Sequence, residues 1–81
     1  MRVTLEPNVY TQINTVTDNY MIQNLGQYAV HVVISDTQPD STVPYDFSLD
    51  PKCGISNSHV EGIVWGKPNG KYAVDVGIVE G

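Results

Sequence analysis

Apolar and polar residues alternate with a period of two along most of this chain, and this alternation limits the folds that it can adopt. Val3 and Leu5 alternate with polar neighbours, and the segment 9–15 repeats the pattern after Pro7. A period of two places successive side chains on opposite faces of a strand, whereas a helix needs about 3.6. Clusters of Gly, Pro, Asn and Asp separate the alternating runs, as they do in turns. The pattern predicts an all-β fold: a small antiparallel β-sandwich or jelly-roll-like single domain spanning residues 1–81.

Two apolar runs in the first half of the chain, 20–25 and 29–35, are joined by only three residues, which predicts a central hairpin. In the second run both alternating faces are partly apolar, so we expect this strand to lie inside the sandwich. The predicted core residues of the two runs are Tyr20, Ile22, Val30, Val32 and Ile34.

Residues 36–54 form a long connection in which three prolines each exclude a central strand position. Phe47 and Leu49 alternate with polar residues and predict one short strand inside it. A connection of this length in so small a chain is either functional or bridges the two sheets in Greek-key fashion. We favour the structural interpretation.

The sharpest local signal lies at residues 63–79, where Asn69-Gly70 separates two apolar runs and suits a tight hairpin. A two-residue loop there segregates apolar from polar side chains best. This register places four further residues in the core: Trp65, Tyr72, Val74 and Val76. A three-residue loop that begins at Pro68 turns Trp65 to the opposite face. Pro68 favours this second register, because proline cannot donate a ladder hydrogen bond beside the turn.

Length and charge limit the classes of function that the chain can serve. The chain has 81 residues, of which 16% are charged, and a net charge of −5. A charged fraction well below the roughly 25% that is typical leaves a surface of Asn, Gln, Ser and Thr, which a partner protein covers easily. Four basic residues against nine acidic ones argue against binding of nucleic acid. No run approaches the roughly 18 apolar residues of a membrane span or the apolar run of a secretory signal, so we expect synthesis in the cytoplasm and no membrane partner.

The residues that could carry chemistry form no recognised pattern. Cys53 is the single cysteine, which excludes an intramolecular disulfide and a multi-cysteine zinc site. A dyad of Cys53 with His59 is conceivable, but we expect a packed, unreactive cysteine and a partly buried His31 that a neighbour satisfies. The aspartates of the long connection lack the spacing of a calcium loop and are expected to be solvated: Asp36, Asp40, Asp46 and Asp50. We therefore expect no enzyme activity, no metal and no cofactor.

Contacts with a partner protein remain as the source of function. Tyr28 and Tyr45 lie on predicted turns, where aromatic side chains can anchor an interface. We expect residues 1–6 to form an N-terminal arm that pairs with, or lies on, another chain. Its predicted interface residues are Arg2, Val3 and Leu5.

A series of short motifs runs along the chain from about Val9 onward. The Tyr-x-Ile-Gln-Asn segment at 20–24 precedes a valine-rich run at 30–35, a Leu-x-Pro step at 49–51, the aromatic segment 64–67 and a valine-rich end at 73–76. In this order the motifs resemble those of a group of short structural proteins of tailed-bacteriophage virions. A glycine often precedes the Leu-x-Pro step in that group, whereas Asp-Phe-Ser stands there in this chain.

The resemblance implies a small β-sandwich that is built into the virion, is often multimeric and carries no catalytic residues. We expect a capsid decoration or cement protein that stabilises the phage head by non-covalent contacts. It would form a homo-oligomer, with a trimer favoured, and bind the major capsid protein or other virion proteins. A tail, neck or fibre-associated adaptor is the alternative within the virion. A glycan-binding module that uses Trp65 or Tyr45 as a stacking platform is the alternative of another class.

Overall fold

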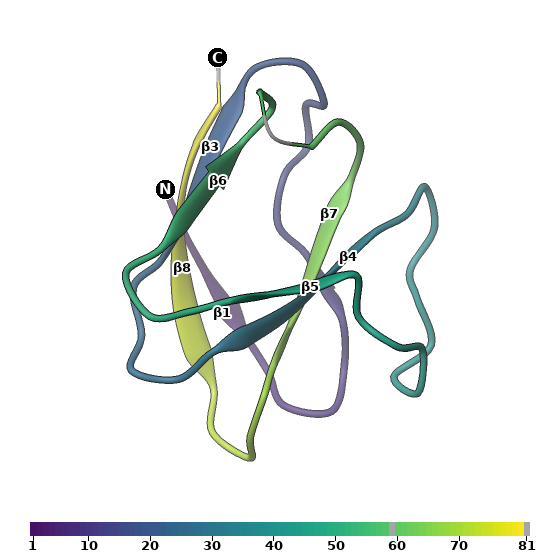
Figure 1. Ribbon diagram of the computed structural model, residues 1–81, viewed down its shortest axis with the longest axis vertical. Helices are drawn as coiled ribbons and strands as arrows, with labels where there is room; N and C mark the ends of the chain where they lie inside the picture. The colour runs from purple at the N-terminus through teal and green to yellow at the C-terminus, as the bar shows by residue number, and fades with distance from the viewer. Residues whose placement is uncertain (59, 81) are drawn as a thin grey trace.

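Eight strands form two four-stranded antiparallel sheets that pack face to face (Figure 1). The computed structural model describes residues 1–58 and 60–80. Sheet A has the order β1-β8-β3-β6, and sheet B has the order β2-β7-β4-β5. These residues contain no helix, so the predicted all-β sandwich is confirmed. The strands are β1 (Arg2–Leu5), β2 (Thr11–Gln12), β3 (Tyr20–Asn24), β4 (Val30–Ile34), β5 (Phe47–Leu49), β6 (Gly54–Ser56), β7 (Val64–Pro68) and β8 (Val74–Glu80).

Strands from the beginning of the chain pair with strands from its end, and the pairs continue inward to β4 and β5. β1 pairs with β8, β2 with β7, β3 with β6 and β4 with β5, each time antiparallel. Further pairs join β3 to β8 and β4 to β7, which completes the two sheets. A long antiparallel ribbon rolled up in this way is a jelly roll of eight strands. The expectation of a jelly-roll-like topology is therefore confirmed.

The two predicted hairpins are wrong. β3 and β4 lie in different sheets, and so do β7 and β8. The connections 25–29 and 69–73 cross between the sheets side by side, and the amide of Asn69 donates to the carbonyl of Ala29 at 2.9 Å. Asn-Gly suits a tight turn but does not require one, and facing sheets lie about 10 Å apart, a gap that a five-residue connection can span. Tyr72, predicted in the core, lies on this crossing and is 56% exposed.

The main core fills the space between the sheets. Leu5, which we predicted at an interface, has no exposed surface and belongs to this core. That prediction was wrong because β1 pairs with β8 of the same chain, where Leu5 lies opposite Val74. Val3 also packs against the core, so residues 2–5 form an edge strand of sheet A. The predicted core residues that are buried here are Tyr20, Ile22, Val30, Val32, Val74 and Val76, and Ile34 is half-buried against them.

Trp65 is buried on the outer face of sheet B and not between the sheets. Along β7, Val64 belongs to the main core, whereas Trp65 packs on the other side with Tyr10 and Val33. Its indole Nε1 donates a hydrogen bond to the carbonyl of Ser35 at 2.8 Å. The predicted burial of Trp65 is right but its predicted face is wrong, because β7 belongs to sheet B and has no hairpin partner in β8.

The connection 35–46, between β4 and β5, covers this outer cluster. Lys67 Nζ donates to the carbonyl of Ser41 at 2.6 Å, and the Tyr10 hydroxyl donates to the carbonyl of Val43 at 3.0 Å. The predicted short strand follows as β5, after which the chain crosses from sheet B to β6 of sheet A. The predicted bridge between the two sheets is therefore confirmed.

A buried asparagine stands at each of two crossings between the sheets. Asn24, at the end of β3, donates through Nδ2 to the carbonyls of Tyr28 (2.8 Å) and Leu49 (3.0 Å). Its Oδ1 accepts the amide of Gly26 at 2.9 Å. Asn24 has no exposed surface, so it replaces water for three backbone groups that the strands leave unpaired.

Asn14 makes the equivalent contacts near the opposite end of the sandwich. Its Oδ1 accepts the amide of Val64 at 2.7 Å, and its Nδ2 donates to the carbonyls of Val16 (2.9 Å) and Gly62 (3.0 Å). Every buried side-chain nitrogen and oxygen in the described part of the chain has a hydrogen-bond partner. Within those residues the interior therefore has no unsatisfied side-chain polar group for a ligand to complete.

We predict that Asn24→Ala lowers the free energy of unfolding by at least about 2 kcal/mol, because several buried backbone groups lose their partner. Urea denaturation followed by Trp65 fluorescence measures this loss. Gln23→Ala is the matched control, since this exposed neighbour makes only a 3.2 Å contact with the Lys52 carbonyl and should change stability by less than about 0.5 kcal/mol. Equal effects of the two substitutions would contradict the role assigned to Asn24.

Candidate functional site

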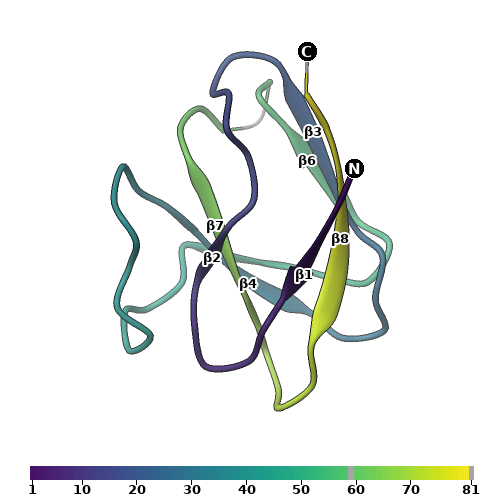
Figure 2. The same ribbon diagram turned by 180° about the vertical axis from the view of Figure 1, so that it is seen from behind.

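The outer faces of the two sheets differ. The connection 35–46 lies over sheet B, on the right in Figure 1 and on the left in Figure 2. In both views the described chain leaves the outer face of sheet A uncovered. Most of the large apolar side chains that are more than half exposed lie on or beside sheet A. This face is the candidate functional site.

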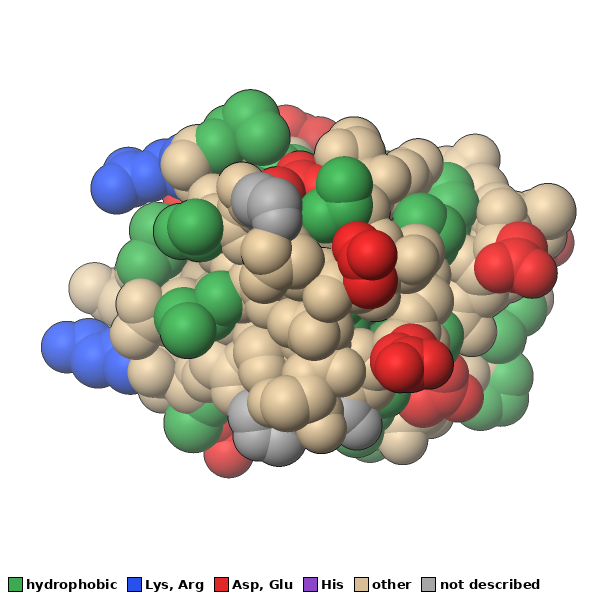
Figure 3. Space-filling view, turned by 90° about the horizontal axis from the view of Figure 1, so that it is seen from above, with side chains coloured by type: hydrophobic (Ala, Val, Ile, Leu, Met, Phe, Trp, Pro, Cys, Tyr) green, Lys and Arg blue, Asp and Glu red, His purple; other side chains and the backbone are tan. Residues whose placement is uncertain are grey.

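Four apolar residues form what we call the sheet A patch: Met1, Met21, Leu25 and Val79. Met21 and Val79 are directly paired across β3 and β8, and they are 61% and 69% exposed. Leu25 lies over Gly77 of the same face, so that a Cβ at position 77 would stand 3.2 Å from its Cδ1. Met1 is 80% exposed and pairs with Ile78 through two backbone hydrogen bonds. Figure 3 looks down on one end of the sandwich and shows hydrophobic side chains on the sheet A side and also on the opposite side.

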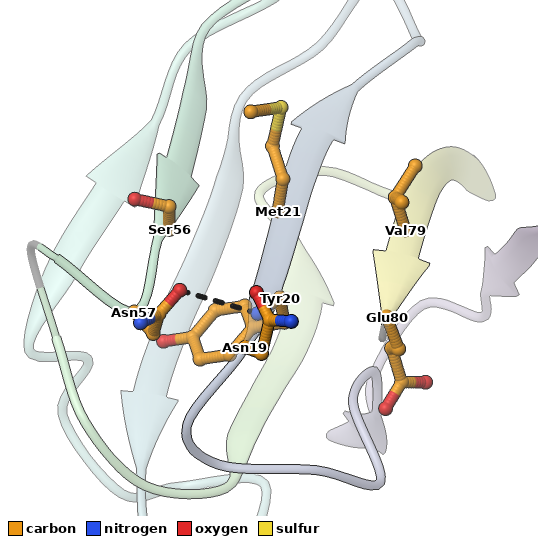
Figure 4. A pocket seen from close by; sticks show the side chains of 7 residues that line it. All are labelled: Asn19, Tyr20, Met21, Ser56, Asn57, Val79 and Glu80. Atoms are coloured by element: carbon orange, nitrogen blue, oxygen red, sulfur yellow. Dashed lines mark hydrogen bonds between the residues drawn. The ribbon is translucent and has the colours of Figure 1, made fainter.

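Two shallow hollows flank the Met21–Val79 pair. One has a volume of about 160 Å³ and lies on the side of Met1 and Gly77. The other has a volume of about 370 Å³ and is drawn in Figure 4, where Met21 and Val79 extend from neighbouring strands. Its lining residues are Asn19, Tyr20, Met21, Ser56, Asn57, Val79 and Glu80. The face therefore consists of an apolar ridge with a depression on either side.

Two oppositely charged groups, Arg2 and Asp75, lie close together on this face. Arg2 Nη1 lies 3.8 Å from Asp75 Oδ2, and the Thr4 hydroxyl donates to Asp75 Oδ1 at 2.7 Å. Gln23 also points outward and donates to a backbone carbonyl of the chain. Because these groups already have partners, a protein that covers the face would leave few of them unpaired.

Glu80 closes one side of the larger hollow. Its Oε2 accepts three hydrogen bonds of 2.8 Å, from the amide and hydroxyl of Thr15 and from the amide of Val16. These bonds favour the ionised form and lower the pKa of the Glu80 carboxyl, with the Thr15 hydroxyl contributing most. The carboxylate thus fastens the connection 13–19 to sheet A.

The residues considered for chemistry are dispersed. Cys53 is exposed, so the prediction of a packed cysteine was wrong, and its proposed partner His59 lies outside the described residues. Asp46 accepts the amide of Ile34, while Asp40 accepts the amide and hydroxyl of Thr42. Within residues 1–58 and 60–80, no group of three His, Cys, Asp or Glu side chains could hold a metal ion.

His31 lies on the outer face of sheet B, partly buried as predicted. Its ring stacks on that of Tyr45 with centroids 3.9 Å apart, and Lys67 is its cross-strand partner. Burial lowers the pKa of His31, the positive charge of Lys67 lowers it further, and a hydrogen bond with Asn69 acts in the opposite direction. The net effect of this arrangement is to disfavour the charged form of the His31 ring.

Of the residues predicted at an interface, Arg2, Tyr28 and Tyr45 are exposed, whereas Leu5 is buried and Val3 is half-buried. Tyr28 stacks on Tyr72 with centroids 5.6 Å apart, beside the crossings between the sheets. The predicted interface residues Tyr28 and Tyr45 are not part of the sheet A patch.

Sequence reasoning missed the sheet A patch itself. Met21 and Val79 alternate with buried residues of β3 and β8, so the period of two already separated them from the core. That signal was usable only once the sheet and its uncovered face were known.

No helix of the described residues is long and apolar enough to cross a membrane. No protein-family model matches this chain, and no curated protein or solved structure is significantly similar to it.

We predict that the protein loses stability as the pH falls below the ordinary His31 pKa of 6.5. The folded-state pKa is lowered, so the unfolded chain takes up the proton more readily and protonation favours unfolding. The stabilisation is present above pH 6.5 and is lost as the pH falls through the folded-state pKa. Urea midpoints at pH 7.5 and 5.5 measure the effect. His31→Phe keeps a ring against Tyr45 and should show a smaller difference between the two pH values; an unchanged difference would assign the effect elsewhere.

Proposed function

We propose that this protein is a structural component of a bacteriophage virion, most specifically a decoration or cement protein that stabilises the head by non-covalent contacts. The observation that carries the proposal is the uncovered apolar face of sheet A. The outer face of sheet B, by contrast, lies under the connection 35–46. Contiguous exposed apolar surface on a small protein marks a site of protein interaction. The motif resemblance supplies the virion as the setting.

The size of the chain fits a protein that acts by surface contact. A stable interface needs about 800 Å² from each partner, roughly one sixth of the 4696 Å² that this chain exposes. Jelly rolls recur in viral capsid domains, which agrees with the proposal by analogy of fold.

The proposed mechanism involves no bond making or breaking. Copies bound across the junctions between capsid subunits would add apolar burial at each junction and so oppose the separation of the subunits. The sheet A patch would serve as the surface of assembly, with β1 held as part of the sheet and not as a free arm. Contacts of Arg2, Tyr28 and Tyr45 with virion proteins remain predictions.

We predict that the double substitution Met21→Gln, Val79→Thr weakens binding to purified phage heads that lack this protein by about tenfold or more, because two apolar side chains of the contact become polar. Co-sedimentation at increasing protein concentration measures the occupancy of the heads. Val43→Thr is the matched control, since Val43 is an exposed apolar residue on the connection that covers sheet B. If the wild-type protein does not bind heads but sediments with tails, the protein would instead be a tail or neck adaptor.

A glycan-binding module is the second candidate, and a specific observation favours it. Tyr45 is about half exposed and its ring is held flat against His31, which presents an aromatic surface of fixed orientation. Trp65 can no longer serve as the platform, because it is buried beneath the connection 35–46.

Titration with the polysaccharides of the host surface separates the two candidates. Trp65 fluorescence reports on the connection that carries Tyr45. Under the virion proposal we expect no change up to millimolar sugar. A saturable change in the wild type that is absent from Tyr45→Ala would instead support the glycan-binding module.

A further inference from the structure

We infer that the sheet A patch binds the same patch of a second copy of this chain, so that two copies form a face-to-face dimer about a two-fold axis. The inference rests on the proposed function in taking this face as the surface of assembly, and it goes further by naming the occupant. Four properties of the face support a second copy: its charge, the pairing of its polar groups, its size and its shape.

Charge favours this face over the others for contact between copies. Each chain carries a net charge of −5, so two copies repel each other on average. On the sheet A face, however, Arg2 and Asp75 form an ion pair and cancel. The acidic hollow at one end, which Asp18, Asp36 and Glu61 help to line, would bring like charges together instead. The Arg2–Asp75 pair therefore adds no net repulsion when a second copy approaches through sheet A, and Glu80 at the side of the larger hollow is the acidic group that the two faces must keep apart.

The polar groups of the face are compatible with burial. Asp75 already accepts from Thr4 as well as contacting Arg2, and Gln23 already donates within its own chain. Burying polar groups costs free energy chiefly when they lose their partners. In a dimer these groups keep the partners that they have in one copy, while the apolar side chains leave water.

The size of the face matches that of its proposed occupant. A standard interface takes about one sixth of the surface of this small chain, so a partner must offer a broad, continuous surface to bind stably. The same face of a second copy has that extent by symmetry. Interfaces of this kind use the same patch on both subunits.

The shape of the face suits the two-fold arrangement. The ridge formed by Met21 and Val79 lies between hollows of about 370 and 160 Å³. When two such faces pack with their strands nearly aligned, a ridge displaced from the axis enters a hollow of the partner. Methionine is flexible and fills irregular gaps, so Met21 can adapt to the hollow that it meets.

Light scattering of the full chain between about 1 and 100 μM tests the inference. We expect twice the 8.9 kDa mass of one chain. Met21→Glu should be monomeric over this range, because each copy then brings a negative charge into the apolar contact. Met21→Lys should also be monomeric alone, and an equimolar mixture of the two variants should regain the dimer mass. Val43→Glu, which adds the same charge on the connection over sheet B, should remain dimeric. Fluorescence of Trp65 confirms that each variant is folded.

A monomeric wild type, a trimer, or a dimer that survives Met21→Glu would each overturn the inference, as would a mixture that stays monomeric. These outcomes are separable from failure of the proposed function. A wild-type monomer that binds heads through Met21 and Val79 would leave the virion proposal standing and reject the dimer. A wild-type dimer that binds no virion component would establish the dimer and reject the proposed function.

Discussion

The structure depends on two buried asparagines that satisfy the backbone where the chain changes sheet. Asn24 connects the crossing after β3 to the end of β5, because its amide bonds both Tyr28 and Leu49. Asn14 connects the segment before β3 to the start of β7 through Val64. A jelly roll of 81 residues has strands of two to seven residues, so many backbone groups lie outside the ladders. Without these amides several of those groups would be buried and unpaired, at a cost comparable to a large part of the stability of a small domain.

The lengths of the connections explain why the outer face of one sheet is covered and that of the other is not. Most connections in this fold are short and run across the ends of the sandwich. The connection 35–46 is long enough to lie over a sheet face, and the Tyr10, Lys67 and Trp65 contacts fix it on sheet B. Sheet A receives no such cover from the described chain. Its exposed methionines and valine are therefore a consequence of how a short chain distributes its connections. In the function that we propose, a partner protein covers these side chains.

The sequence predicted the strands much better than their partners. The alternation located β1, β3, β4 and β5, because a period of two follows directly from strand geometry. The run 9–15 contains only the two-residue β2, since residues outside it follow connections instead of a ladder. Pairing was mispredicted because strands close in sequence usually form hairpins, and neither Asn69-Gly70 nor the short 26–28 segment reveals that the chain crosses to the other sheet.

The errors in the candidate residues follow from those pairing errors. Tyr72 was placed in the core only because a hairpin would have extended β8 backward to include it. Trp65 was assigned to the main core because only one apolar face was expected along β7, whereas the strand packs a cluster on each side. Leu5 was placed at an interface because the partner of an N-terminal strand, β8, is the most distant strand in the sequence.

In the described chain sheet B is packed on both sides, whereas sheet A is packed on one side and exposes the sheet A patch on the other. In an acidic chain, the position of the Arg2–Asp75 pair beside the sheet A patch matters more than the total number of charges, because the pair adds no net charge where these apolar side chains are exposed. Apolar burial supplies affinity over such a face, and the balanced pair reduces the electrostatic penalty of bringing two faces together. Under the proposed function, the placement of the connections therefore decides which sheet face is open to a partner.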